Sequence, residues 1–220
     1  MFIRPLLLGH SMTSRILAAA LLAAISSPAL AQAPAPAAAP APAASAKELI
    51  PVAIDTSLGR IVVALDKTDA PVTTANFLHY VDTHRFDGEN FYRAMHVGKG
   101  GLIQGGITSD ARKVYAPIAH EATTKTGLHD VAGAIVMANA GAGTARSDFF
   151  ILDSDMPSLD ATADTPGFAV FGHVVEGMDV VEKILASPVS PTKGEGVMKG
   201  QMLDPQIKII KVSRVAPSKP

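Results

Sequence analysis

The chain has 220 residues, of which 48% are hydrophobic, and a formal net charge of −1 at pH 7. Its charges are scattered, which excludes the basic surface of a nucleic-acid-binding protein and gives no sign of a membrane-surface binder. There is no cysteine, so disulfides, thiol nucleophiles and zinc–thiolate sites are excluded.

Residues 1–31 have the layout of a secretory signal peptide. Arg4 and Arg15 precede an apolar run over 16–25, and small residues follow up to a predicted cut after residue 31. The run is too short to cross a bilayer, which takes about 20 residues. We therefore expect an exported protein, and the periplasm is its expected location. An uncleaved N-terminal anchor and a true start at Met12 are the alternatives.

Residues 32–47 form a low-complexity segment rich in alanine and proline. Proline fixes φ and lacks an N–H, so this composition blocks helix and favours extended backbone. We expect a disordered linker. The alternative is a proline-rich segment that binds another protein. Residues 48–214 are numerous enough for one well-buried domain, and 215–220 are expected to form a flexible tail.

The domain opens with a predicted hairpin and a predicted helix. β-Branched runs over 52–56 and 60–65 flank Ser57-Leu58-Gly59, which is typical of a β-hairpin. Pro71 suits the first turn of a helix. Apolar positions then recur at helical spacing through about Thr83.

Short strands and glycine-rich corners make up the rest of the domain. Strands are expected over 91–95, 102–104, 133–139, 148–152, 167–175 and 206–212, with a glycine-rich loop over 96–101 and an irregular segment over 107–132. A second helix is expected from Gly177-Met178-Asp179, ended by Pro188. Many short strands with two helices indicate a mostly β fold, either a barrel or a sandwich.

Most motifs of catalytic and metal sites are missing from the sequence. Gly98-Lys99-Gly100-Gly101 lacks the spacing of a phosphate-binding loop, and no two histidines lie four residues apart. Asp153-Ser154-Asp155 starts like a calcium loop, but Pro157 and the lack of a following glycine exclude it. There is no Gly-x-Ser-x-Gly nucleophile motif. We therefore expect no metal and no cofactor.

One charged residue, Arg93, lies in an apolar strand pattern. Arginine is seldom buried unless it is paired, so a structural ion pair is the leading interpretation on the pattern alone. The surrounding motifs change this interpretation. They are Phe91-Tyr92-Arg93, Leu102-Ile103-Gln104-Gly105-Gly106, Met137-Ala138-Asn139-Ala140-Gly141 and Ser147-Asp148-Phe149-Phe150-Ile151.

These motifs, in this order, resemble those of the cyclophilin family of peptidyl-prolyl cis–trans isomerases. The similarity extends over about 52–212 and includes Val170-Phe171-Gly172 and Gly177-Met178. It implies a closed antiparallel β-barrel of about eight strands with two capping α-helices. It also implies a cofactor-independent enzyme that accelerates X–Pro bond rotation in folding or extended polypeptides.

The resemblance further implies the site residues and partners. Arg93 would be the catalytic residue. The substrate would be bound by Phe91, Leu102, Gln104, Ala138, Asn139, Asp148, Phe150, Leu159 and Phe168. Expected partners are proline-containing segments of exported proteins and cyclosporin-like ligands. We expect a monomer, with no nucleic-acid partner and no stable membrane association after signal cleavage.

Several positions depart from the family pattern near Arg93. Tyr92 replaces a frequent His. Asp148 replaces the usual Gln, and its carboxylate could orient Arg93, compete with the substrate for it, or be engaged by Arg146.

Two further departures affect the walls of the expected pocket. The 94–103 segment is longer than usual and places Gly100-Gly101 before Leu102, so one aromatic wall is expected to be missing. Ser158 stands where many members carry a large aromatic, and the 161–167 loop is extended. These changes favour the alternative function, a proline-peptide-binding or chaperone-like module with little turnover. A purely structural β domain is the third interpretation.

Overall fold

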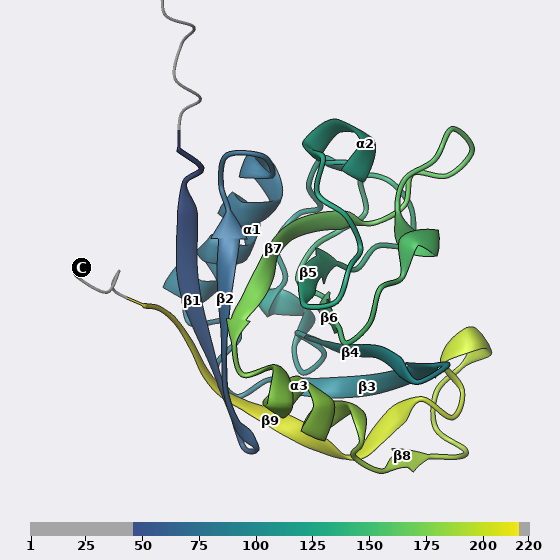
Figure 1. Cartoon of the computed structure of the whole chain (residues 1–220). Helices are drawn as coiled ribbons and strands as arrows, with labels where there is room; N and C mark the ends of the chain where they lie inside the picture. Colours follow the sequence, from purple (N-terminus) through teal and green to yellow (C-terminus); the bar gives the residue numbers. More distant parts are fainter. Residues whose placement is uncertain (1–45, 216–220) are drawn as a thin grey trace, which may run out of the picture. The chain divides into compact units, whose positions relative to one another are not determined.

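The computed structural model describes residues 46–215. The predicted signal peptide, most of the predicted linker and nearly all of the predicted tail lie outside the described residues. Nine strands form one antiparallel sheet in the order β1-β2-β7-β5-β6-β4-β3-β9-β8 (Figure 1). Because β1 also pairs with β9, eight of the strands close into a barrel, with β8 attached outside the ring. The closed barrel of eight strands is thus confirmed.

The elements follow the sequence-based expectations closely. The strands are β1 (Leu49–Thr56), β2 (Gly59–Asp66), β3 (Asn90–Val97), β4 (Gly100–Gly106), β5 (Ala134–Met137), β6 (Phe149–Leu152), β7 (Ala169–Glu176), β8 (Val189–Ser190) and β9 (Met202–Arg214). The helices are α1 (Pro71–Asp82), α2 (Thr123–Thr126) and α3 (Met178–Leu185). The four-residue α2 and the two-residue β8 were not predicted. No helix in residues 46–215 is long and apolar enough to cross a membrane.

The predicted glycine-rich loop over 96–101 is wrong. The chain instead forms a tight hairpin, in which Val97 pairs with Gly100 and β3 and β4 extend almost to the turn. Gly98 has a φ of 60°, a left-handed conformation that favours glycine in a two-residue hairpin turn. The glycines therefore tighten the hairpin instead of lengthening a loop.

Alternation along the strands divides the apolar side chains between two faces. Those pointing into the barrel form the main core with the helices, and they include Ile103, Ile135, Phe149, Ile151 and Phe171. Their neighbours along the strands point outward and form a second, smaller cluster that includes Leu102, Val136, Phe150, Leu152 and Val170. The outer cluster forms an apolar surface on the outside of the barrel, over β4, β5, β6 and β7.

The two predicted helices contact opposite ends of β2. At the end of α1 nearest Asp66, the Thr74 hydroxyl donates to the Asp66 carbonyl oxygen at 3.0 Å. At the other end of β2, a Cβ on Gly59 would lie 2.7 Å from Val180 of α3. Both helices bury their apolar residues in the main core, among them Phe77 and Val181. They therefore close the barrel interior and leave its outer apolar cluster available for the site.

Candidate active site

A cavity of about 640 Å³ lies over the outer face of β3, β4 and β6. Of the ten residues that the sequence assigned to the site, nine line this cavity. They are Arg93, Leu102, Gln104, Ala138, Asn139, Asp148, Phe150, Leu159 and Phe168. Residues far apart in the sequence are thus brought to one surface, as the resemblance implied.

Phe91, the tenth predicted site residue, does not line the cavity. Its side chain is 0% exposed and belongs to the barrel core. The ring packs edge-on against Phe149, with centroids 5.7 Å apart. Phe91 pairs with Gly105 on β4, and alternation turns it to the inner face. Its prediction as a substrate contact is therefore corrected to that of a core residue.

A register shift in β3 brings two consecutive side chains to the site. The pairing of β3 with both β4 and β9 slips between Phe91 and Arg93. Such a bulge re-aims side chains that strict alternation would send to opposite faces. As a result, Tyr92 and Arg93 both form hydrogen bonds to Gln104.

Arg93 is held by neutral acceptors. Its Nη1 donates to Gln104 Oε1 at 2.7 Å and its Nε donates to Gln201 Oε1 at 2.8 Å. Its Nη2 lies 3.2 Å from the Met95 sulfur, a weak acceptor. Within residues 46–215 Arg93 forms no ion pair, so the structural ion pair favoured by the pattern alone is wrong. The Arg93 charge is not neutralised by a carboxylate.

A polar chain behind Arg93 fixes its orientation. Asp148 Oδ2 accepts from the Tyr92 hydroxyl at 3.0 Å, so that hydroxyl offers its lone pairs to Gln104 Nε2 at 2.8 Å. The Gln104 amide is thereby turned with its oxygen toward Arg93. Asp148 thus acts on Arg93 through two intervening side chains.

Of the three possibilities that the sequence left for Asp148, orientation of Arg93 is the one that the contacts support, and Asp148 acts indirectly through Tyr92 and Gln104. It forms an ion pair neither with Arg93 nor with Arg146 among the described residues. Its other oxygen, Oδ1, accepts from the Ser147 hydroxyl at 3.2 Å. The hydrogen bond from the Tyr92 hydroxyl to Asp148 was not predicted from the sequence.

Burial controls the protonation of this polar chain. Burial, followed by the Asp148 charge, raises the pKa of Tyr92, which therefore stays a neutral hydroxyl donor. Burial also raises the pKa of Asp148, although hydrogen bonds from Tyr92 and Ser147 oppose the rise. Burial lowers the pKa of Arg93, but arginine starts so high that it stays charged at neutral pH.

Apolar side chains make the wall opposite Arg93. The rings of Phe150 and Phe168 pack edge to face with centroids 5.4 Å apart. Leu159 is brought beside Phe168 by the hydrogen bond from Phe168 N to the Leu159 carbonyl oxygen at 3.0 Å. Aromatic and aliphatic side chains that line the same cavity as Arg93 suit a small apolar ring next to one polar atom.

The Asn139 side chain forms a hydrogen bond within the loop that follows β5. Its Oδ1 accepts from Gly141 N at 2.9 Å, and Thr144 Oγ1 accepts from Ala140 N at 2.9 Å. These two bonds fix the loop at the edge of the cavity. The Asn139 amide is thus engaged within the protein.

Sequence reasoning missed several cavity residues. They are Met95, Ile107, Val114, Ala140, Thr144, Arg146, Ser147, Val197 and Met198. The last two are the least expected, because they come from the segment between β8 and β9. A Cβ at Gly101 would lie 1.9 Å from the Met95 carbonyl oxygen, so no side chain can form a wall there. Met95, Val197 and Met198 line the cavity near Arg93 instead.

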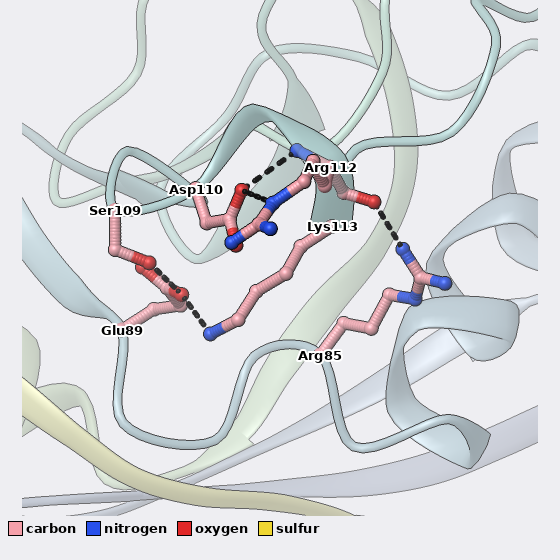
Figure 2. Close-up of polar contacts among 6 residues, drawn as sticks. All are labelled: Arg85, Glu89, Ser109, Asp110, Arg112 and Lys113. Carbon is pink, nitrogen blue, oxygen red and sulfur yellow. Dashed lines mark hydrogen bonds and ion pairs between the residues drawn. The ribbon is translucent and has the colours of Figure 1, made fainter.

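The segment that follows β4 is fastened by a buried carboxylate (Figure 2). Glu89 is 1% exposed and accepts from Ser109 Oγ at 2.6 Å and from Lys113 Nζ at 2.8 Å. Arg85 Nη1 donates to the Arg112 carbonyl oxygen at 3.1 Å. These contacts hold the segment that carries Ile107 and Val114 to the cavity.

Asp130 lies completely buried next to the segment that carries Leu159. Its backbone N donates to Asp160 Oδ1 at 3.1 Å, while neither of its own carboxyl oxygens has a hydrogen-bond partner by geometry. Burial, followed by the Asp160 charge, raises the pKa of Asp130 from 3.8 to about 7. Between these values the folded protein binds a proton that the unfolded chain releases, so its stability falls as pH rises.

We expect the contribution of Asp130 to the free energy of unfolding to drop by about 2–4 kcal/mol between pH 4 and 7. The D130N variant should lose this pH dependence, while the part of the pH dependence that is due to Asp148 stays. Urea unfolding at several pH values measures it, with D164N, which alters an exposed carboxylate, as the control. An unchanged slope in D130N would show that Asp130 ionises normally in the folded protein.

Comparison with known proteins decides the family. The family model for cyclophilin type peptidyl-prolyl cis-trans isomerases matches residues 51–214. The chain belongs to the cyclophilin family. This cyclophilin is 38% identical over 150 residues to peptidyl-prolyl cis-trans isomerase cyp18 of Streptomyces antibioticus, covering 65% of the chain and 87% of that relative. It is 39% identical over 137 residues to peptidyl-prolyl cis-trans isomerase A of Dickeya dadantii, covering 60% and 70%.

Solved structures agree on the fold. A crystal structure of a Cryptosporidium parvum cyclophilin type peptidyl-prolyl cis-trans isomerase matches this cyclophilin with a TM-score of 0.62 and 22% identity, covering 78% of the chain and 99% of that structure. The chain is thus an enzyme of the isomerase class, a cyclophilin-type peptidyl-prolyl cis–trans isomerase. Among residues 46–215 no group of three or more His, Asp or Glu could hold a metal ion.

Proposed function

We propose that this cyclophilin rotates X–Pro bonds by directing Arg93 at the prolyl nitrogen of a substrate held against Phe150, Leu159 and Phe168. One observation carries the proposal. Arg93 lines the cavity as a charge held by neutral acceptors, opposite an apolar wall. Such a group can donate to a substrate without first breaking an ion pair.

The chemistry requires no group transfer. Rotation about an X–Pro bond breaks amide resonance and has a barrier of about 20 kcal/mol. At the top of the barrier the prolyl nitrogen is pyramidal and has regained its lone pair. A donor at that nitrogen therefore stabilises the transition state more than the planar ground state. A charge-assisted hydrogen bond of about 1.5–3 kcal/mol corresponds to roughly 10- to 150-fold in rate.

The apolar wall would add a second contribution. A twisted amide is less dipolar than a planar one, so it loses less solvation when it leaves water. Phe150 and Phe168 supply the apolar surface on which a proline ring could lie. A second crystal structure of the Cryptosporidium parvum cyclophilin, with a TM-score of 0.61, was obtained in the presence of the dipeptide Ala-Pro. The apolar lining of the present cavity would likewise suit a proline-containing ligand.

Turnover of a proline peptide by the purified protein tests the proposal. Because no acid or base acts in the mechanism, kcat/KM should be nearly constant from about pH 6 to 8. A bell-shaped profile centred near the ordinary histidine pKa of about 6.5 would contradict Arg93 as the chief catalyst.

A binding module with little turnover is the second candidate function. The lack of a side chain at Gly101 and the small Ser158 favour it, because the family resemblance places bulkier walls of the pocket at these positions. Calorimetric binding of the same peptide without accelerated isomerisation would establish this alternative. Binding of the peptide together with clearly accelerated isomerisation would reject this alternative.

We further propose that the protein is exported to the periplasm, acts there as a monomer on proline-containing segments of exported proteins, and accepts cyclosporin-like ligands in the same cavity. The layout of residues 1–31 supports export. N-terminal sequencing of the protein purified from its source should begin at Gln32. A first residue within 1–31 would contradict cleavage at the expected position, and light scattering would reveal any oligomer.

A further inference from the structure

Gln201 lies beside Arg93 although 108 residues separate them in the chain. Its Oε1 accepts from Arg93 Nε at 2.8 Å, and its backbone oxygen accepts from Ala94 N at 2.9 Å. Gln201 thus contacts Arg93 from the β9 side of β3, whereas Gln104 contacts it from the β4 side. The segment before β9, yellow in Figure 1, runs beside β3 and β4.

The Gln201 amide is itself fixed in one orientation. Its Nε2 donates to the Val197 carbonyl oxygen at 2.9 Å, which leaves the amide oxygen facing Arg93. Its backbone N donates to the Met198 carbonyl oxygen at 3.1 Å. Because both ends of the amide are engaged, Gln201 is an acceptor whose position is set before any substrate binds.

The two glutamines together restrict the Arg93 guanidinium. A guanidinium carries five N–H bonds, and contacts with Gln201, Gln104 and Met95 occupy three of them. One N–H on each terminal nitrogen stays available for a substrate. If Gln104 were the only glutamine in contact with Arg93, the guanidinium plane could still rotate about that one hydrogen bond.

We propose that Gln201 is a positioning residue that fixes the plane of Arg93 for catalysis. The inference rests on the proposed role of Arg93. Gln201 does not touch the reacting bond in this mechanism. It increases the fraction of molecules in which the free N–H groups of Arg93 are aimed at the prolyl nitrogen. Its removal should therefore lower kcat more than it raises KM.

Three variants separate this role from a general effect on β9. Q201L removes the acceptor at similar volume and should lower kcat/KM about 3- to 10-fold, mostly in kcat. Q201E keeps an acceptor for Arg93 Nε, but it pairs the guanidinium with a carboxylate and loses the donor to the Val197 carbonyl oxygen, so it should recover only part of the rate. Q206L alters an exposed glutamine of β9, five residues further along the chain, and should match the wild type. Equal kcat for Q201L and wild type, both folded by circular dichroism, would overturn the proposal.

A double-mutant cycle gives an independent readout. In the R93A background Q201L should cause no further loss, because there is no guanidinium left to position. An equal additional loss would show that Gln201 acts otherwise. If Q201L does not fold, the Nε–H of Arg93 in the wild type decides the matter by NMR. Slow solvent exchange would support the fixed contact, and exchange as fast as that of free arginine in water would overturn it. Absence of turnover in the wild type would instead reject the proposed function.

Discussion

The R93A variant should lose about 10- to 150-fold in kcat/KM, corresponding to about 1.5–3 kcal/mol of transition-state stabilisation. Arg93 is the cationic donor placed opposite the apolar wall, and alanine leaves the cavity without it. The loss should appear mainly in kcat, because the proposed bond forms only when the prolyl nitrogen regains its lone pair.

R93K is the matched control for charge alone. Lysine keeps a positive charge but has no planar fork, so it cannot contact Gln104 and Gln201 as Arg93 does. We expect R93K to stay well below the wild type. Activity of R93A within about twofold of the wild type, in a folded protein, would contradict the mechanism.

The F91A variant should lose about 3–5 kcal/mol in the free energy of unfolding. The Phe91 ring is fully buried and packs against Phe149 in the barrel core, so truncation leaves a cavity there. Chemical denaturation measures this loss. The substitution removes no side chain from the peptide-binding cavity, so the molecules that stay folded should bind a proline peptide normally.

F168A is the matched comparison for F91A. Phe168 is only half-buried, lines the cavity and packs on Phe150. Its truncation should raise KM for a proline peptide and cost less stability than F91A. The reverse result, a stable F91A with impaired binding, would return Phe91 to the substrate site.

Much of the fold followed from local patterns. The β1–β2 hairpin and helix α1 begin and end close to the predicted positions, because apolar periodicity and Pro71 specify them locally. The hairpin of β3 and β4 was mistaken for a loop because glycines in a tight turn and in a loop look alike in sequence. The resemblance, and not periodicity, supplied barrel closure.

Site residues that belong to a sequence motif were predicted. Site residues that only tertiary contacts bring to the cavity were missed. Phe91 was misplaced because its motif neighbour Arg93 reaches the cavity after a β-bulge, whose position the sequence does not indicate. Gln201 and Met198 lie in a segment with no motif, and their proximity to Arg93 depends on the pairing of β3 with β9. No local pattern encodes a contact over such a separation.

The most direct test of the central claim is exchange NMR on a proline peptide mixed with the wild type or with R93A, with circular dichroism to confirm that both are folded. We expect the wild type to accelerate cis–trans exchange at catalytic concentration, and R93A to lose most of this acceleration while still binding the peptide. Equal acceleration by both proteins would contradict the assignment of Arg93. Binding by both without acceleration would contradict turnover at this cavity.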